Sequence, residues 1–156
     1  MKLELKHLAP YLPYGLKIKA YDNIWNLDGY RVSAIKPLVV VNQHSLTSSH
    51  LREVKPLLRP ISSMTKEEAY EFGILLMGEA DMEDKEVGIG EMRLMGATYP
   101  TIVYKDKEDE EYSITIQFSS VGISGIDLVP YEAYEWLFDH HFDVFNLIEN
   151  NLAIAK

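Results

Sequence analysis

Two adjacent histidines flanked by aspartates form the cluster whose residue types come closest to a metal or acid–base site. The cluster reads Asp139-His140-His141-Phe142-Asp143, and on a helix His140 and Asp143 would lie one turn apart, where they could share a cation. Adjacent helical residues point about 100° apart, so both histidines cannot face one ion. His141 falls on an apolar stripe, where a hydrogen-bonded core histidine is the ordinary finding. We therefore predict a structural role for this cluster and no metal site.

Three other short motifs match ligand-binding loops in letters only. Asn26-Leu27-Asp28-Gly29 is not a calcium loop, because the first and twelfth ligands in register would be Ile24 and Ile35. Gly88-Ile89-Gly90 lacks the third glycine of a dinucleotide-binding motif. Gly122-Ile123-Ser124-Gly125 has no nearby lysine or arginine to hold a nucleic-acid backbone. We predict turns at all three, with no catalytic or cofactor-binding residues, and the sequence favours a non-enzymatic role.

Charge is divided unevenly along the chain, whose net charge is −9 over 156 residues. Residues 1–78 carry 10 basic and 7 acidic side chains, whereas residues 79–156 carry 5 and 17. An acidic surface repels phosphate backbones, so nucleic acid is not the expected partner of the whole chain. The basic first half leaves a nucleic-acid-associated factor open as an alternative. Its most basic stretch, Arg52, Lys55 and Arg59, lacks aromatic residues for base stacking, which favours a solvated connector.

Composition excludes several further classes of protein. Cysteine is absent, which removes disulfide scaffolds, thiolate nucleophiles and cysteine zinc sites. The N-terminal segment Met1–His7 alternates charge with leucine and has no apolar core of the kind that a signal peptide needs. The longest apolar runs, Leu38–Val41 and Ile74–Met77, are far shorter than the roughly 20 residues of a membrane helix. We expect a soluble, cytoplasmic protein that does not contact a membrane.

Alternation of apolar and polar residues predicts an antiparallel sheet of four to five strands. The charged run Lys105–Glu111 would be costly to bury and is expected to form the tip of the last hairpin, in which Asp106–Glu110 is expected to be dispensable. The Ser/Thr/His segment 42–50 and the acidic segment 79–91, which lacks sustained periodicity, are expected to be loops. The two prolines in residues 8–14 favour extended or polyproline backbone. The strands are expected at residues 15–21, 30–35, 38–41, 101–104 and 112–118.

Two helices are expected to pack on one side of this sheet. Thr65 and Glu68 have the spacing of a capping box, which predicts a short helix over about 65–77. Apolar residues recur at spacings of three and four after Pro130, which predicts a long C-terminal helix over about 130–150. It is expected to end in a Schellman turn with Asn151 in the left-handed conformation. The sequence thus predicts an α+β fold in a single domain, residues 1–156.

Three stretches of the chain resemble small uncharacterised proteins of Bacteroidetes-type phages, prophages and mobile elements. Residues 1–15 read MKLELKHLAPYLPYG, residues 54–65 read VKPLLRPISSMT, and residues 136–154 contain WLFDHHFDVFNLIE with its LAI tail. The length of these strings makes the similarity fairly specific, although they cover under a third of the chain. The resemblance implies a phage or mobile-element context in a bacterial host, and it carries no activity or site residues.

Three classes of function follow from these observations. A non-enzymatic accessory or protein-interaction protein of a phage or mobile element fits them best, with another protein as its partner. A nucleic-acid-associated factor that uses the basic N-terminal half is the first alternative. A small-ligand binder or an enzyme without a recognisable motif is the second, and no cofactor is expected.

Overall fold

A computed structural model describes the protein over residues 2–20, 23–32, 37–41, 44–46, 54–108, 113–119 and 122–156. The chain forms two compact units, and each contains a β-sheet and short helices, so the predicted α+β class is confirmed. The strands form two sheets rather than the one that alternation predicted. That residues 1–156 form one domain stays a prediction. Unit 1 comprises Met1–Arg59, Phe138–Asp143 and Leu147–Lys156, and unit 2 comprises Pro60–Leu137 and Val144–Asn146.

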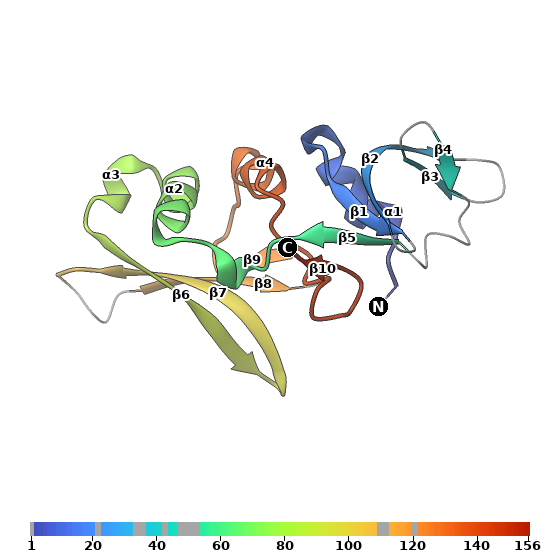
Figure 1. The fold of residues 1–156 in the computed structure, drawn as a ribbon. Helices are drawn as coiled ribbons and strands as arrows, with labels where there is room; N and C mark the ends of the chain where they lie inside the picture. Colours follow the sequence, from blue (N-terminus) through green and yellow to red (C-terminus); the bar gives the residue numbers. More distant parts are fainter. Residues whose placement is uncertain are drawn as a thin grey trace. The chain divides into compact units, whose positions relative to one another are not determined.

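Unit 1 contains a sheet with the strand order β10-β5-β1-β2-β3-β4 (Figure 1). Neighbouring strands are antiparallel except β10, which pairs parallel to β5. On β1 the lysines are exposed while Ile18 and Ala20 are buried, so the strand has the single wet face that its sequence predicted. The strands are β1 (Lys17–Ala20), β2 (Asn23–Val32), β3 (Pro37–Val41), β4 (His44–Leu46), β5 (Val54–Leu58) and β10 (Ile154–Ala155).

The segment before β1 is helical, and the extended backbone predicted for residues 8–14 is wrong. α1 (Leu5–Leu8) continues into the 3-10 helix η1 (Ala9–Tyr14). The fixed φ of proline, about −65°, also suits a 3-10 helix, so the two prolines do not oppose this conformation. Tyr11 of η1 is fully buried and its hydroxyl donates to the Phe142 carbonyl at 2.6 Å, which anchors the helix.

Asp28-Gly29 lies within β2 and does not form the predicted hairpin turn. The pairing of β2 with β3 shifts register between Leu27 and Gly29, as it does at a β-bulge. Glycine is common at bulges because its backbone is permissive. β4 lies within the segment 42–50 that was predicted as a loop, and residues 42–43 and 47–50 lie outside the described residues.

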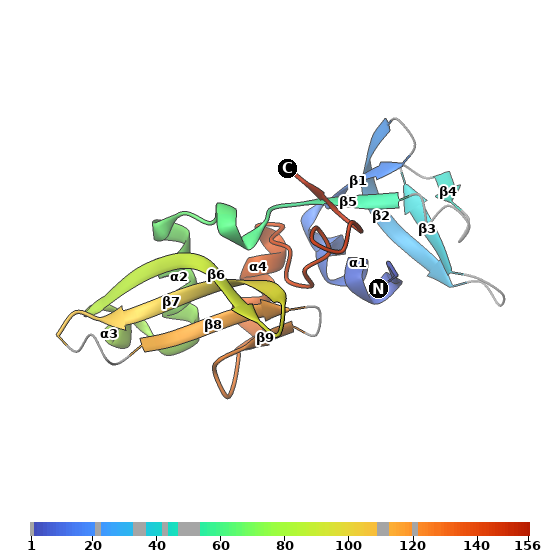
Figure 2. The same ribbon diagram turned by 90° about the horizontal axis from the view of Figure 1, so that it is seen from below.

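Unit 2 contains the antiparallel sheet β6-β7-β8-β9, and α2 and α3 lie on one of its faces (Figures 1 and 2). The hairpin predicted from residues 101–118 is confirmed by the pairing of β7 with β8. The loop predicted over residues 79–91 is wrong, because this segment forms α3 and most of β6. The elements are α3 (Glu79–Met82), β6 (Lys85–Leu94), β7 (Ala97–Asp106), β8 (Ser113–Ser119) and β9 (Gly122–Ser124).

The first predicted helix is present as α2 (Lys66–Met77), and its capping box is confirmed. Thr65 Oγ1 accepts from the Glu68 backbone at 3.1 Å, and the Glu68 carboxylate accepts from the Thr65 backbone at 2.9 Å. Phe72 on the buried side of α2 packs near Phe118 of β8, with ring centroids 6.2 Å apart, and near Trp136, at 5.9 Å. These aromatic contacts form the centre of the core of unit 2.

Gly73 in the interior of α2 is required by packing. A Cβ atom at this position would lie 2.6 Å from Met82 Sδ and 2.7 Å from a ring carbon of Tyr104. Tyr104 cannot easily withdraw, since its buried hydroxyl donates to the Ala69 carbonyl at 2.8 Å. The glycine therefore allows α2 to approach the sheet closely.

The second helix, α4 (Tyr131–Asp139), is much shorter than the predicted span of 130–150. His141 has a left-handed φ of 57°. The chain then extends along Arg59, whose N–H donates to the His141 carbonyl and whose carbonyl accepts from the Asp143 N–H, both at 2.8 Å. This pairing with a residue distant in sequence prevents the helix from continuing, although the apolar spacing of the sequence continues.

The predicted turn at Asn151 is present, although it ends a short turn segment rather than a long helix. Asn151 has a left-handed φ of 56°. Its N–H donates to the Ile148 carbonyl at 2.9 Å, and the Leu152 N–H donates to the Leu147 carbonyl at 2.8 Å. This is the hydrogen-bond pattern of a Schellman turn.

Candidate functional site

The histidine that sequence analysis placed on the apolar stripe has two polar partners in unit 1. His141 Nε2 lies 2.9 Å from the Tyr14 carbonyl, and Nδ1 lies 2.9 Å from Lys156 Nζ. Because an ammonium group only donates, Nδ1 accepts and the proton resides on Nε2. Partial burial lowers the pKa of His141, and the nearby Lys156 charge lowers it further. His141 is therefore held as a neutral imidazole.

Asp143 is buried and its carboxylate is occupied by backbone groups. Its two oxygens accept from Leu147 N at 2.8 Å and from Ile148 N at 2.7 Å. Burial raises the pKa of Asp143 by more than these two hydrogen bonds lower it, so the pKa is above its ordinary value. His140 stacks on the Phe142 ring with centroids 6.4 Å apart. Across the part of the chain that the structure describes, no three His, Asp or Glu side chains gather so that they could hold a metal ion.

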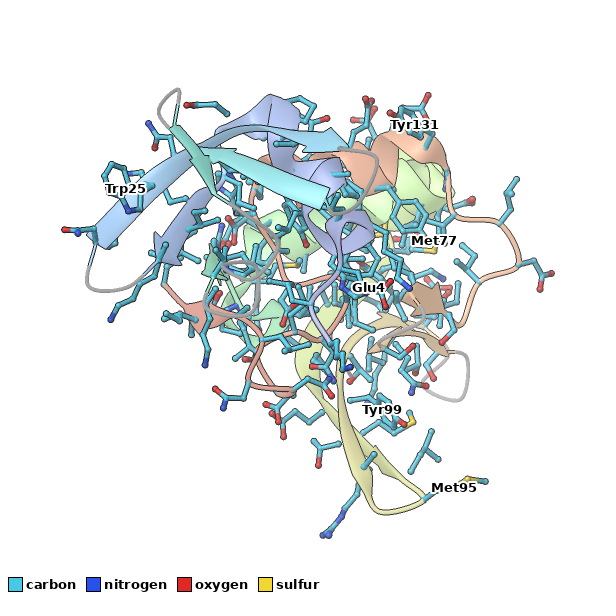
Figure 3. All side chains as sticks on the ribbon, turned by 90° about the vertical axis from the view of Figure 1, so that its right-hand side faces the viewer. Glu4, Trp25, Met77, Met95, Tyr99 and Tyr131 are labelled. Atoms are coloured by element: carbon cyan, nitrogen blue, oxygen red, sulfur yellow. The ribbon has the colours of Figure 1, made fainter. Side chains whose placement is uncertain are left out.

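The hairpin formed by β6 and β7 presents exposed apolar side chains at its tip. The two strands pair from Lys85–Asp106 to Leu94–Ala97, so each extends for about 30 Å. Met95 at the turn is 107% exposed and Leu94 is 44% exposed. Figure 3 shows Met95 at the free end of the hairpin, with Tyr99 further back along it. We call Leu94, Met95 and Gly96 the hairpin tip.

The backbone of the hairpin tip is also unusual. Met95 and Gly96 both have positive φ, 50° and 83°, as the two central residues of a type I′ turn must. Asn-Gly is the favoured sequence for this turn, whereas a non-glycine residue such as methionine in the left-handed region costs about 1 kcal/mol. The chain thus keeps an apolar side chain in water and in a strained conformation, a combination that occurs at functional sites.

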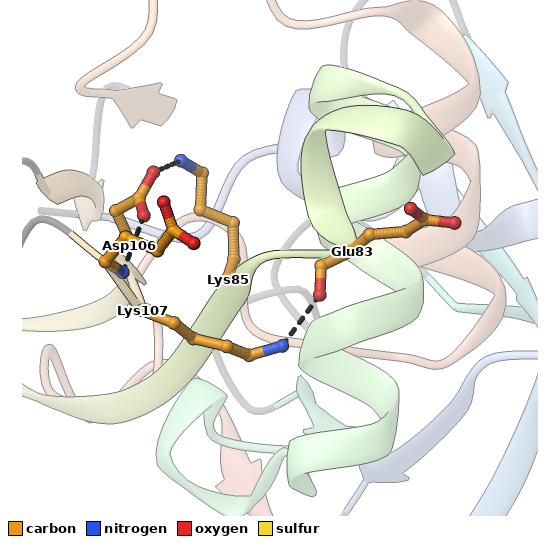
Figure 4. A network of polar contacts seen from close by, with 5 residues as sticks. Glu83, Lys85, Asp106 and Lys107 are labelled. Carbon is orange, nitrogen blue, oxygen red and sulfur yellow. Dashed lines mark hydrogen bonds and ion pairs between the residues drawn. The ribbon is translucent and has the colours of Figure 1, made fainter.

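Charged contacts hold the other end of this hairpin (Figure 4). Lys85 Nζ contacts Asp106 Oδ2 at 2.9 Å, and Lys107 Nζ donates to the Glu83 carbonyl at 2.7 Å. Asp106 Oδ1 also accepts from the Glu108 N–H at 3.0 Å. The run predicted as a dispensable tip therefore begins with two residues whose side chains contact Lys85 and the Glu83 carbonyl, and its dispensability stays a prediction. Residues 109–112 lie outside the described residues.

A groove of about 530 Å³ lies between α2 and the beginning of β6. The three carboxylates among the described lining residues, Glu67, Glu71 and Glu86, are all exposed. The ring of Tyr70 is half-buried. The described residues that line the groove are Lys66, Glu67, Tyr70 and Glu71 from α2 and residues 85–87 from β6.

A second charged feature, which we call the basic face, lies in unit 1. Lys17 and Lys19 share the exposed side of β1, and Lys19 stands directly opposite Lys55 of β5. Burial lowers the pKa of Lys156, and the positive charges of Arg59 and Lys17 lower it further, so both charges act on Lys156. Like charges placed opposite each other on a sheet are destabilising. The basic face consists of Lys17, Lys19, Lys55, Arg59 and Lys156.

Comparison with known proteins found no matching family model, no matching curated protein and no matching solved structure. Among the helices that the structure describes, none is long and apolar enough to cross a membrane.

Sequence reasoning missed both the hairpin tip and the groove. A signal was present, since Val87 and Ile89 alternate with Gly88 and Gly90 as strand residues do. The glycines and the neighbouring acids obscured it, because both residue types are depleted in strands.

Proposed function

We propose that the protein is a non-enzymatic interaction protein that binds another protein through its hairpin tip. The exposure of Leu94 and Met95 at the end of a long paired hairpin supports this proposal. Burial of these side chains against a partner would gain about 25 cal/mol for each Å² removed from water. Methionine also adapts its shape to varied apolar surfaces, which suits a contact residue.

The proposed setting is that of an accessory protein of a phage or mobile element in the cytoplasm of a bacterial host. This setting rests on the resemblance of residues 1–15, 54–65 and 136–154 alone. Its practical consequence is that the partner is expected among proteins encoded by the same element.

The test is affinity capture from cells that express the neighbouring genes, with three forms of the protein as bait. The wild type is compared with the tip variant Leu94→Ser/Met95→Ser and with Leu128→Ser, which alters an exposed apolar residue away from the hairpin. We expect one protein that the wild type and Leu128→Ser retain and that the tip variant loses by about tenfold or more. Equal recovery of the same proteins by all three forms would contradict the proposal.

A second function, binding of nucleic acid through the basic face, is favoured by one specific observation. The chain is acidic overall, yet the basic face brings together five cations, and Lys19 and Lys55 stand opposite each other despite their repulsion. A phosphate backbone would relieve that repulsion, and its binding would weaken steeply with salt.

The second function is tested by retention on immobilised DNA over a salt gradient. We expect Lys19→Glu/Lys55→Glu to elute at lower salt than the wild type. Lys66→Glu removes an exposed lysine in unit 2. We expect it to lower the eluting salt concentration only as far as its change in net charge does. If both variants shift elution equally for each charge changed, the basic face has no special role.

A further inference from the structure

We propose that the outer edge of β6 binds an extended, basic segment of the partner protein as an added strand, seated in the groove beside α2. This inference rests on the proposed function, because it assigns a second contact to the same interaction protein. It specifies the conformation and the charge of the segment that is bound.

The edge of β6 supplies the first argument. β6 ends the four-stranded sheet, with β7 on one side. Among the described residues, the backbone–backbone hydrogen bonds of β6 are those it makes with β7. The outer edge thus presents unpaired N–H and C=O groups, which are a template for another strand.

The residues in the middle of β6 leave this edge accessible. Natural edge strands are protected by charged side chains, but the charges of β6 lie toward its ends and Val87–Gly90 is uncharged. Two of these four residues are glycines, and the atom nearest to a Cβ added at Gly88 is the Val103 carbonyl oxygen, 3.9 Å away. Glycine within a strand is typical of a place where another backbone approaches.

The groove supplies the second argument, because it lies beside this same edge. Its lining joins residues 85–87 of β6 to the exposed side of α2. A peptide added between an edge strand and a helix gains affinity from main-chain hydrogen bonds and specificity from alternate side chains. The groove volume of about 530 Å³ falls within the roughly 300–1,000 Å³ of binding pockets.

The charge of the groove indicates which segment it binds. Glu67, Glu71 and Glu86 make no ion pair within the described residues. Lys85 is already paired with Asp106, so Lys66 is the one cation outside that pair among the described lining residues. The surplus of carboxylates attracts lysine and arginine. The nearby ring of Tyr70 adds a face on which a cation can rest.

The test measures fluorescence anisotropy of labelled synthetic peptides with the purified full-length chain. The probe alternates arginine with valine over about ten residues, the length of β6. One comparison peptide replaces arginine with glutamate. Another keeps every side chain and carries N-methyl groups on alternate amides, which removes hydrogen-bond donors from one edge. We expect binding of the arginine peptide, with losses of about tenfold or more for both comparison peptides.

Variants of the chain complete the test. Glu71→Lys/Glu86→Lys should weaken binding of the arginine peptide by about tenfold or more. Glu79→Lys/Glu132→Lys, which makes the same charge change at exposed positions outside the groove, should weaken it far less. Bound peptide should also slow hydrogen exchange of amides in β6.

Three results would overturn the inference: no binding of the arginine peptide, equal losses in both variants, or equal binding of the N-methylated peptide. The last would indicate attraction of charge without strand addition. Failure of this inference is distinguishable from failure of the proposed function. The peptide assay depends on the edge of β6 and uses purified chain, whereas the capture experiment depends on the hairpin tip.

Discussion

The neutral imidazole of His141 couples the stability of unit 1 to pH. Its pKa in the folded chain lies below the ordinary value, so protonation favours the unfolded state. The stabilisation is therefore fully present above the unfolded pKa of about 6.5 and is lost as pH falls from there through the lower folded pKa. His7 has the same sign, because burial lowers its pKa and its Nδ1 accepts from the Glu4 N–H at 3.0 Å. We expect the urea midpoint to fall between about pH 7.5 and about pH 5.

His141→Asn isolates the contribution of His141 to this pH dependence. Asparagine tolerates the left-handed backbone at this position and does not titrate. The variant should therefore show a shallower decline of the urea midpoint than the wild type, with the remaining slope due to His7 and the carboxylates. If the variant and the wild type have parallel pH profiles, His141 is not held neutral by its partners.

For the substitution of Gly73 by alanine, we expect a change in the free energy of unfolding opposite to the one that helix propensity predicts. Alanine normally stabilises a helix interior by about 1 kcal/mol relative to glycine. At Gly73 the added methyl would collide with Met82 and Tyr104, and overpacking of this kind costs about 1–3 kcal/mol. Gly73→Ala should therefore lower the free energy of unfolding measured with urea. Gly88→Ala, whose added Cβ would meet only the Val103 carbonyl oxygen at 3.9 Å, is the control without a collision, and a more stable Gly73→Ala chain would contradict the packing.

Local residue features were the ones that sequence could predict. The Thr65–Glu68 capping box and the Asn151 turn each depend on groups a few residues apart, and both are present. The partners of His141 and Asp143 depend on how the chain returns to η1 and folds back on itself. Residue type and spacing along the sequence do not predict those contacts.

At the scale of elements, sequence periodicity failed where tertiary contacts or unusual residues intervene. Apolar spacing continued beyond Asp139, but the hydrogen bonds of Arg59 draw residues 141–143 into an extended path. In β6 the alternation was genuine, but two glycines made it resemble a loop. The candidate site was missed for the same reason, since β6 forms one side of the groove and its last residue, Leu94, begins the hairpin tip.

The hairpin tip gives a prediction at this scale. Met95→Asn places the residue that a type I′ turn prefers before Gly96. It should raise the free energy of unfolding by about 0.5–1 kcal/mol, because the backbone strain is relieved. The same change should reduce capture of the partner, because it removes the apolar contact. A variant that is destabilised, measured by its urea midpoint, would show that Met95 stabilises the free chain.

For the whole molecule, the path of the chain predicts that both units unfold together. The C-terminal segments alternate between the units along the sequence, and Val144–Asn146 of unit 2, with Val144 buried, follow Asp143 and precede Leu147 of unit 1. Each unit contains one of the two tryptophans, Trp25 in unit 1 and Trp136 in unit 2. Fluorescence of the Trp25→Phe and Trp136→Phe variants therefore reports on each unit separately. After correction for the stability change measured by circular dichroism, we expect coincident midpoints; separate transitions would indicate two independent domains.

The exposure of Met95 has a chemical consequence. Methionine in water is oxidised by dilute peroxide to its sulfoxide, whereas Met64 and Met82 are buried and protected in the folded chain. Mild oxidation should therefore modify Met95 before Met64 and Met82, leaving a mass increase on the peptide that contains Met95 while the core stays intact. The sulfoxide is polar, so an oxidised chain loses the apolar character of its hairpin tip without any mutation. A methionine sulfoxide reductase that accepts the exposed side chain would reduce the sulfoxide back to methionine, so the loss of apolar character at the hairpin tip is reversible.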